Sequence, residues 1–146
     1  MKVLILGNQA RSVQNFWTVL IRHLKNRGIT VRVCIPAGDP GRDHEIAETC
    51  DGVSHFYLER KGINPLQDLR SYRELCRLFR DEKPDVVFAT TIKPVIYGCL
   101  AARKTGVPHV YATITGLGYT FEADSFLKRL IHRVSVGLYT LALRHV

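Results

Sequence analysis

The sequence has no apolar run long enough to cross a bilayer and no recognisable leader peptide. The apolar stretch at residues 134–143 falls far short of the roughly 20 residues that a membrane-spanning helix needs. The apolar start, residues 3–6, is too short for a signal sequence and runs directly into Gly7. We therefore expect a cytoplasmic protein.

Cysteine is scarce, and its spacing fits neither disulfide nor metal sites. The four cysteines show no CxxC pair and lie mostly in apolar runs, which is typical of buried free thiols in a reducing compartment. The zinc-protease pattern HExxH and the nucleophile elbow GxSxG are also missing. We expect no metal and no cofactor, and no catalytic residue can be assigned. The cysteines are Cys34, Cys50, Cys76 and Cys99.

Negative charge is in short supply. Against 21 Lys and Arg residues stand 13 Asp and Glu residues, which gives a net charge of +8. This balance predicts attraction to phosphorylated substrates or to an anionic membrane surface. The basic residues form no block, and no aromatic RNA-binding signature is present, so nucleic acid is not expected as a partner.

The hydrophobic pattern predicts five strands that alternate with helices. Because consecutive strands separated by helices form right-handed crossovers, the sequence predicts a Rossmann-like α/β domain over residues 1–146, an open parallel sheet with helices on both faces. The expected strands are 2–6, 30–35, 53–58, 85–89 and 109–114. The expected helices follow the first strand, lie around 45–49 and at 66–81, start at Pro94, and start at Asp124 or Ser125.

Apolar spacing also predicts which helix faces are buried. In the first helix the predicted buried face holds Phe16, Val19, Leu20, His23 and Leu24, with Gly28 as the C-terminal cap. In the helix at 66–81 it holds Leu69, Tyr72, Leu75, Cys76 and Phe79. The last helix has a broad apolar surface, which either covers a face of the sheet or meets another domain or an anionic bilayer.

Two loops are expected at the carboxyl edge of the sheet, where open α/β sheets bind ligands. They are residues 90–93 and 115–121. The first strand also ends there, at Gly7 and Asn8, but without GxGxxG and without an acidic residue ending the second strand. This disfavours a dinucleotide-dependent oxidoreductase. Gly7 either lets a ligand approach the backbone or permits a tight strand-to-helix turn.

The loop at 115–121 and the lysine before Pro94 supply the remaining candidates. Backbone N–H groups of the glycine-containing loop can hold an anion, although Tyr119 and Phe121 can equally be packing residues. Lys93 is expected to face a ligand at the same edge, with a solvated lysine as the alternative. The predicted substrate-binding residues are Gly7, Asn8, Thr91, Lys93, Thr115, Gly116, Gly118 and Tyr119.

Residues 83–121 resemble the N-terminal domain of family 4 (group 1) retaining glycosyltransferases, which have the two-domain GT-B fold. The resemblance is carried by KPDVVFATTIKPVIYG, AARKTGVPHV and ATITGLGYTF, and the opening MKVLILGN agrees in register. It implies a hexosyltransferase that moves a sugar from a nucleotide-sugar donor to a polyprenyl-diphosphate-linked or polysaccharide acceptor in cell-envelope biosynthesis. The N-terminal domain of such enzymes mainly receives the acceptor.

The resemblance also implies what this chain does not supply. The donor nucleotide and the acidic E-x7-E motif belong to the family's C-terminal domain, so residues 1–146 are expected to be the acceptor-side half, inactive alone. Many members carry a histidine after the fifth strand, whereas Thr115-Gly116-Leu117-Gly118 has none. The alternative is a non-catalytic binding or membrane-recruiting subunit of a split glycosyltransferase. Peripheral contact with the inner face of the membrane is expected in either case.

Overall fold

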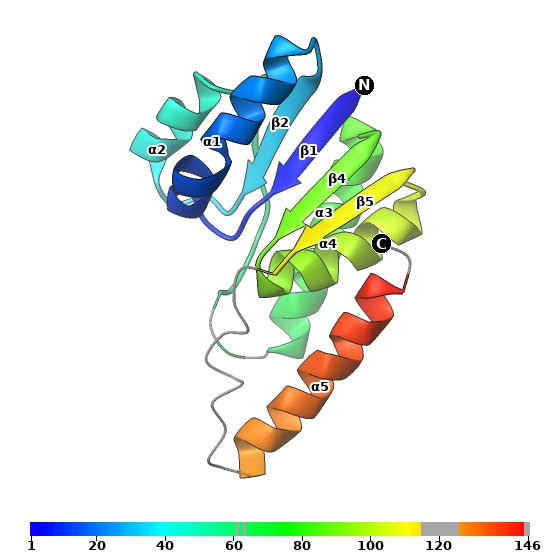
Figure 1. The fold of residues 1–146 in the computed structure, drawn as a ribbon. Helices are drawn as coiled ribbons and strands as arrows, with labels where there is room; N and C mark the ends of the chain where they lie inside the picture. Colours follow the sequence, from blue (N-terminus) through cyan, green and yellow to red (C-terminus); the bar gives the residue numbers. More distant parts are fainter. Residues whose placement is uncertain (61, 63, 115–125, 145–146) are drawn as a thin grey trace.

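The computed structural model describes residues 1–60, 62, 64–114 and 126–144 (Figure 1). Five parallel strands form one sheet in the order β3-β2-β1-β4-β5. The predicted open parallel sheet is confirmed. Its strands are β1 (Lys2–Leu6), β2 (Thr30–Ile35), β3 (Val53–His55), β4 (Val86–Thr90) and β5 (His109–Thr113).

Helices cover both faces of the sheet, as predicted (Figure 1). On one face lie α1 (Ala10–Asn26) and α2 (Pro40–Ala47), and on the other lie α3 (Pro65–Glu82) and α4 (Ile92–Thr105). The last helix, α5 (Phe126–Leu143), packs mainly against α4. The described part of the chain holds no helix that is both long and apolar enough to span a membrane.

The strands supply two separate cores because their side chains alternate between the faces. Val3 and Ile5 of β1 join the core under α1 and α2. Leu4 and Leu6 join the core under α3 and α4. A continuous apolar run with both faces buried is what a central parallel strand requires.

Local signals fix several helix ends. Gly28 and Gly106 have φ of 74° and 75°, which is a left-handed backbone conformation. These glycines end α1 and α4, so the predicted C-terminal cap at Gly28 is confirmed. Asp39 and Asn64 cap the N-termini of α2 and α3, and each is followed by proline at the first helical position.

The predicted buried face of α1 is wrong except at Leu24. Phe16 and Val19 are 69% and 82% exposed, and His23 is also exposed. The face toward the sheet instead carries Ala10, Val13, Trp17, Ile21 and Leu24. The helix is turned this way because Trp17 packs edge-on against the Phe88 ring of β4, with ring centroids 4.9 Å apart.

Smaller corrections concern element ends and one leucine. α2 begins at Pro40, where Asp39 caps it, and β3 ends at His55, three residues earlier than expected. α4 begins two residues before Pro94. Proline is tolerated there because the first four N–H groups of a helix have no carbonyl partner within the helix. Leu69 is 42% exposed, against the prediction, whereas Leu75, Cys76 and Phe79 are buried.

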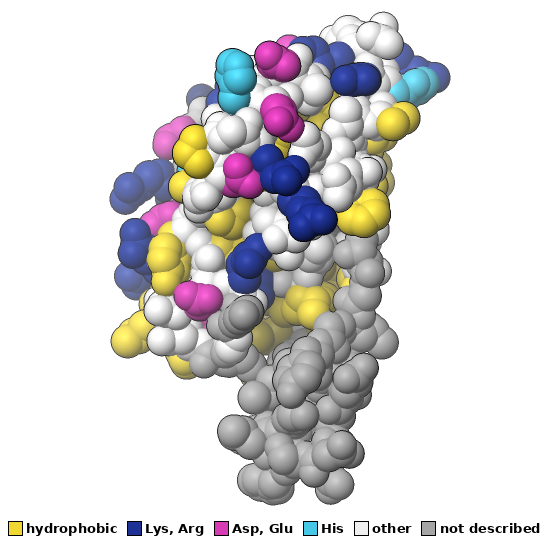
Figure 2. All heavy atoms as spheres, turned by 90° about the vertical axis from the view of Figure 1, so that its left-hand side faces the viewer, with side chains coloured by type: hydrophobic (Ala, Val, Ile, Leu, Met, Phe, Trp, Pro, Cys, Tyr) yellow, Lys and Arg dark blue, Asp and Glu magenta, His cyan; other side chains and the backbone are white. Residues whose placement is uncertain are grey.

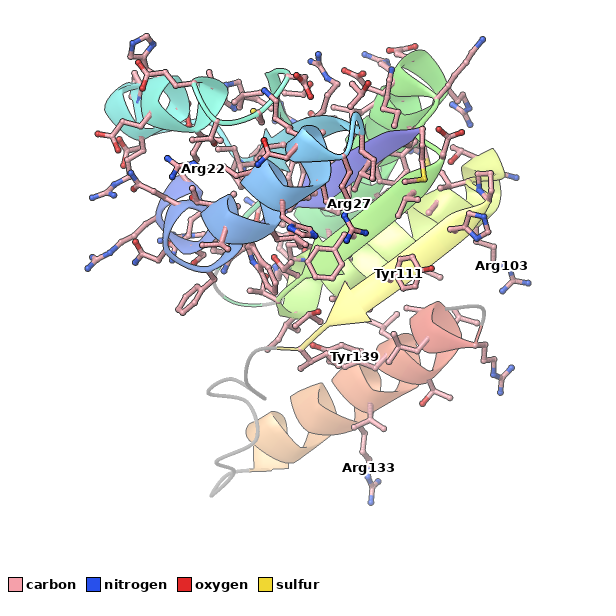
Figure 3. All side chains as sticks on the ribbon, turned by 45° about the horizontal axis from the view of Figure 1, so that its top comes forward. Arg22, Arg27, Arg103, Tyr111, Arg133 and Tyr139 are labelled. Carbon is pink, nitrogen blue, oxygen red and sulfur yellow. The ribbon has the colours of Figure 1, made fainter. Side chains whose placement is uncertain are left out.

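The described side chains of α5 contact the domain near its C-terminal end. Tyr139 and Ala142 are buried, and Tyr139 points back toward the sheet and α4 while Arg133 points away (Figure 3). Burial raises the pKa of Tyr139 to about 12. Val134, Val136 and Leu141 stay exposed. An interface of α5 with another domain or a bilayer therefore stays a prediction.

Candidate functional site

The strand order places a topological switch point between β1 and β4. The chain leaves β1 toward β2 and leaves β4 toward β5, so α1 and α4 diverge from adjacent strand ends. Such a crevice outside the carboxyl ends of the strands is where open α/β sheets bind ligands. The register pairs Leu6 with Ala89. Continued by two residues, it sets Asn8 opposite Thr91.

Both of these residues carry a buried polar atom that lacks a partner. Asn8 Oδ1 and Thr91 Oγ1 are buried and hydrogen-bond to no residue in the described ranges. A buried polar group without a partner is costly, by about 1–3 kcal/mol, and each such group in a native fold calls for an explanation. Two of them, just beyond the carboxyl ends of adjacent strands, indicate a position where a ligand could supply the missing hydrogen bonds.

The backbone at Thr91 is strained. Its φ of 70° and ψ of 170° lie in a region that is essentially restricted to glycine. The conformation is held from both sides. Thr91 N donates to Thr113 O of β5 at 3.0 Å, and Val95 N of α4 donates to Thr91 O at 3.0 Å. The neighbouring Thr90 Oγ1 donates to Leu6 O at 3.1 Å. Thr91 is thus fixed with its hydroxyl unused.

The helix N-termini at the switch point differ from those at the side of the sheet. α2 and α3 have side-chain caps and an acidic residue in the first turn. α1 and α4 have neither. Their free N–H groups and positive dipole ends therefore remain available to an anion between β1 and β4.

Gly7 is explained by packing alone. A Cβ atom on Gly7 would meet Val13 Cγ2 of α1 at 2.6 Å and Ile35 Cγ2 of β2 at 3.3 Å. Glycine is therefore needed for α1 to pack closely on the sheet. This supports the second alternative given for Gly7, a tight strand-to-helix turn. A role of Gly7 in ligand binding stays a prediction.

Lys93 has a partner that the sequence reasoning did not foresee. Its Nζ lies 2.8 Å from Asp68 Oδ1 of α3 and donates to Glu59 O at 2.8 Å. The Lys93 and Asp68 side chains are only 14% and 9% exposed. The pair links the first turns of α3 and α4 below the carboxyl edge. Lys93 is therefore neither a solvated lysine nor an ammonium without a partner, although contact with a ligand stays a prediction.

Tyr97 extends this buried cluster. Burial and the nearby Asp68 carboxylate both raise its pKa, because each disfavours the tyrosinate. Tyr97 consequently stays a neutral phenol at physiological pH. The cluster thus has one cation, one anion and one neutral hydroxyl group.

Two residues at this edge were missed by the sequence analysis. Arg60 follows β3 and donates a hydrogen bond from Nη1 to Gln9 Oε1, which brings a guanidinium beside the N-terminus of α1. Gln9 Nε2 donates to Ser12 Oγ at 2.8 Å. The signal for Arg60 was its place after the third strand, since all parallel strands end at the same edge.

The predicted site residues therefore divide into three groups. Gly7 and Asn8 follow the carboxyl end of β1, Thr91 follows that of the adjacent β4, and Lys93 lies set back in its ion pair. Thr113 at the end of β5 bonds to Thr91, so β5 delivers the chain to this edge. The other predicted residues, Thr115, Gly116, Gly118 and Tyr119, lie outside the described residues.

One sequence feature needs a correction. Glu74 and Glu82 have the E-x7-E spacing, although we expected that motif only in the C-terminal domain of the two-domain fold. Glu74 Oε2 accepts from Tyr57 N at 2.6 Å, and its Oε1 lies 2.9 Å from Arg70 Nε. Glu82 lies at the far end of α3, 2.9 Å from Arg32 Nε. Both carboxylates serve the fold away from the switch point, so the spacing is not a donor site.

The cysteine prediction is confirmed, since all four are free and buried. Burial raises the pKa of Cys99 to about 11 and raises that of Cys34 and Cys50 above the usual value, which keeps these thiols protonated. Within the described ranges no cluster of His, Cys, Asp and Glu is suited to a metal ion.

The parallel sheet, its strand order and the helices on both faces define a Rossmann-like domain. The chain belongs to the glycosyl transferase 4-like family, whose model matches residues 2–143. This confirms the predicted resemblance.

Two bacterial transferases are related to the chain. It is 24% identical over 144 residues to the N,N'-diacetylbacillosaminyl-diphospho-undecaprenol alpha-1,3-N-acetylgalactosaminyltransferase of Campylobacter jejuni, covering 99% of this chain and 38% of that protein. It is 29% identical over 118 residues to the UDP-Gal:alpha-D-GlcNAc-diphosphoundecaprenol alpha-1,3-galactosyltransferase of Escherichia coli, covering 80% and 28%. The chain thus covers little more than a third of the first relative and less than a third of the second.

Solved structures share the fold. A UDP-N-acetylglucosamine 2-epimerase superposes with a TM-score of 0.65 at 18% identity, over 94% of this chain and 40% of the epimerase. MurG of Acinetobacter baumannii superposes with a TM-score of 0.57 at 18% identity, over 77% and 34%. At these identities the likeness shows the fold alone.

Proposed function

We propose that the chain is the acceptor-binding domain of a glycosyltransferase that moves a sugar from a nucleotide-sugar donor to a polyprenyl-diphosphate-linked or polysaccharide acceptor. The related transferases of C. jejuni and E. coli are both named for undecaprenol-diphosphate-linked sugars. The donor would bind to a second domain, and the acceptor diphosphate would lie at the switch point of this one. The protein would work in the cytoplasm, in peripheral contact with the inner face of the membrane.

The observation that carries the proposal is the pair of unsatisfied atoms on Asn8 and Thr91, set between two uncapped helix N-termini. Helix dipoles and free N–H groups favour the phosphates, whose negative charge would be stabilised there. The Thr91 hydroxyl can donate to a phosphate oxygen or to a sugar, and the Asn8 side chain can accept from a sugar hydroxyl. The site therefore suits an acceptor that carries both groups.

The test is calorimetric binding of a soluble, short-chain polyprenyl-diphosphate sugar to the purified chain. Asn8→Ala should weaken binding by up to about tenfold, because a neutral hydrogen bond contributes roughly 0.5–1.5 kcal/mol. Stability should not fall, since Asn8 Oδ1 has no partner within the described ranges and its burial is costly. Asn26→Ala, at the exposed end of α1, is the matched control and should bind normally. Wild-type affinity in Asn8→Ala would contradict the site.

A further inference from the structure

The segment that follows β3 contacts both of the helices that diverge at the switch point. Its Glu59 O accepts a hydrogen bond of 2.8 Å from Lys93 Nζ in the first turn of α4. The next residue, Arg60, donates a hydrogen bond from Nη1 to Gln9 Oε1, and Gln9 is the N-cap residue of α1. Arg60 is thereby held between the N-termini of α1 and α4.

The positive charge of Arg60 is not neutralised within the described part of the fold. The residue is exposed, and it forms no ion pair with any residue that the structure describes. Its hydrogen-bond partner, the Gln9 amide, is neutral, and a second bond from Gln9 Nε2 to Ser12 Oγ fixes that amide in place. Lys93 differs, because its ammonium lies against the Asp68 carboxylate. Of these two cations, Arg60 is the one whose charge is available to a ligand.

The Lys93–Asp68 pair anchors the backbone that carries Arg60. Both side chains are largely buried, and Lys93 Nζ donates to the Asp68 carboxylate as well as to Glu59 O. A buried ion pair seldom adds net stability compared with apolar residues of similar size. What the pair does is fix the Glu59 carbonyl. Because the peptide unit that joins Glu59 to Arg60 is planar and rigid, the backbone of Arg60 is fixed with it.

A guanidinium in this position suits a diphosphate group. Arginine presents parallel N–H donors that match two phosphate oxygens, and it stays charged at physiological pH. The first turns of α1 and α4 contain no acidic residue, so no carboxylate there competes for the guanidinium. Figure 2 views the side toward which the strands of Figure 1 point, and it shows Lys and Arg side chains along the middle of that side. Positive charge is thus present where the strands end.

We propose that Arg60 binds the diphosphate of the ligand at the switch point, and that Lys93 and Asp68 are positioning residues that hold Arg60 there. The inference rests on the proposed function, since the diphosphate is taken to belong to the lipid-linked acceptor. A nucleotide-sugar donor carries the same chemical group, so the experiment has to separate the two sources. Asn8 and Thr91 would bind the same ligand beside Arg60.

The test is calorimetric binding of a short-chain polyprenyl-diphosphate sugar to the purified chain. Arg60→Gln should weaken binding by about 10- to 100-fold, because it removes charge-assisted hydrogen bonds to the phosphates. The matched control is Arg27→Gln, which loses the same charge at the opposite end of α1, about 25 Å from the first turn of that helix. This control should stay within about threefold of wild type. Equal losses in the two variants would overturn the proposal.

A double-mutant cycle tests the positioning role of the buried pair. Lys93→Met combined with Asp68→Leu should weaken binding about tenfold when Arg60 is present, because Glu59 O loses its donor and Arg60 is no longer held in place. In the Arg60→Gln background the same two substitutions should have little further effect. A purely structural role would weaken binding equally in both backgrounds, and that result would overturn the positioning claim.

The remaining measurements identify the source of the diphosphate and separate this inference from the proposed function. UDP-N-acetylglucosamine should bind wild type and Arg60→Gln alike. A loss with this UDP-sugar as large as the loss with the acceptor analogue would assign Arg60 to the donor and overturn the inference. Weak binding by Asn8→Ala together with wild-type affinity in Arg60→Gln would support the proposed function and contradict the inference. A wild-type chain that does not bind the acceptor analogue would contradict both.

Discussion

At the scale of single residues, Thr91 shows strain placed where function is expected. A β-branched residue in a glycine-only region costs of order 1–3 kcal/mol, and here it also holds an unused hydroxyl. We expect Thr91→Gly to raise the free energy of unfolding by about 1 kcal/mol, because relief of strain exceeds the added freedom of the unfolded chain. The same variant should bind a diphosphate acceptor analogue about tenfold more weakly.

Urea denaturation and calorimetry measure the two effects separately. Thr91→Ser is the control, since it keeps the hydroxyl and should keep most of the affinity. A Thr91→Gly protein that unfolds more easily than wild type would show that the threonine side chain stabilises the fold, and the strain would then need another explanation.

Lys93 differs from Thr91, because its charged group already has a partner within the protein, the Asp68 carboxylate. A lysine that faced a ligand could be removed with little effect on stability. Here its removal leaves the Asp68 carboxylate buried without its cation, which costs about 3–5 kcal/mol. We expect Lys93→Ala to lower the free energy of unfolding by that amount in urea titrations.

Two further variants decide whether the Lys93 effect comes from the buried pair. Lys93→Met combined with Asp68→Leu should recover much of the loss, because no unpaired charge remains. Lys25→Ala is the control. Lys25 Nζ lies 3.1 Å from Asp51 Oδ1 in a more exposed pair, so its loss should cost less than about 1 kcal/mol. Similar costs for Lys25 and Lys93 would contradict the argument.

At the scale of helices and strands, the sequence predicts whether a segment is a helix or a strand better than it predicts which helix face is buried or where an element ends. The apolar runs of β1, β2 and β4 are unmistakable because both faces of a central parallel strand are buried. The face of α1 could not be predicted, because Phe16 and Val19 are as apolar as Val13 and Ile21. The choice depends on Trp17 meeting Phe88 of β4, a contact between segments far apart in the sequence.

The packing of α4 on the sheet depends on one glycine. A Cβ atom on Gly98 would collide with Leu6 Cδ2 of β1, and Ala89 Cβ of β4 would lie 3.6 Å away. We expect Gly98→Ala to lower the free energy of unfolding by about 1–3 kcal/mol, because the overpacked helix must shift. Thermal unfolding checks this.

The control for Gly98 is another glycine within a helix. Gly137 of α5 is exposed, and a Cβ atom added to it would meet no described atom within 4 Å. Gly137→Ala should therefore stabilise the protein by up to about 1 kcal/mol, through helix propensity alone. If both alanine variants changed stability in the same direction, close packing would not be the reason for Gly98.

At the scale of the whole molecule, the sequence predicts which strand ends share an edge but not how the charges there are paired. Parallel strands carry Asn8 and Thr91 to a common edge, which motif order alone indicates. Lys93 and Asp68 are 25 residues apart, and their ion pair forms only once α3 and α4 pack together. Arg60 reaches Gln9 for the same reason, across 51 residues. Pairing of this kind is set by tertiary structure.

Recognition and catalysis are expected to separate in this chain. Under the proposed function its switch point would offer N–H groups and the Thr91 hydroxyl to an acceptor, whereas Glu74 and Glu82, with the E-x7-E spacing, make structural contacts. Stabilising the departing nucleotide diphosphate takes donors aimed at the charge that develops there, and we assign none in residues 1–146. Purified residues 1–146 should therefore bind an acceptor analogue yet release no nucleotide from UDP-sugars, as followed by a coupled assay. Acceptor-dependent nucleotide release by this chain, abolished in Asn8→Ala, would show instead that one domain performs the transfer.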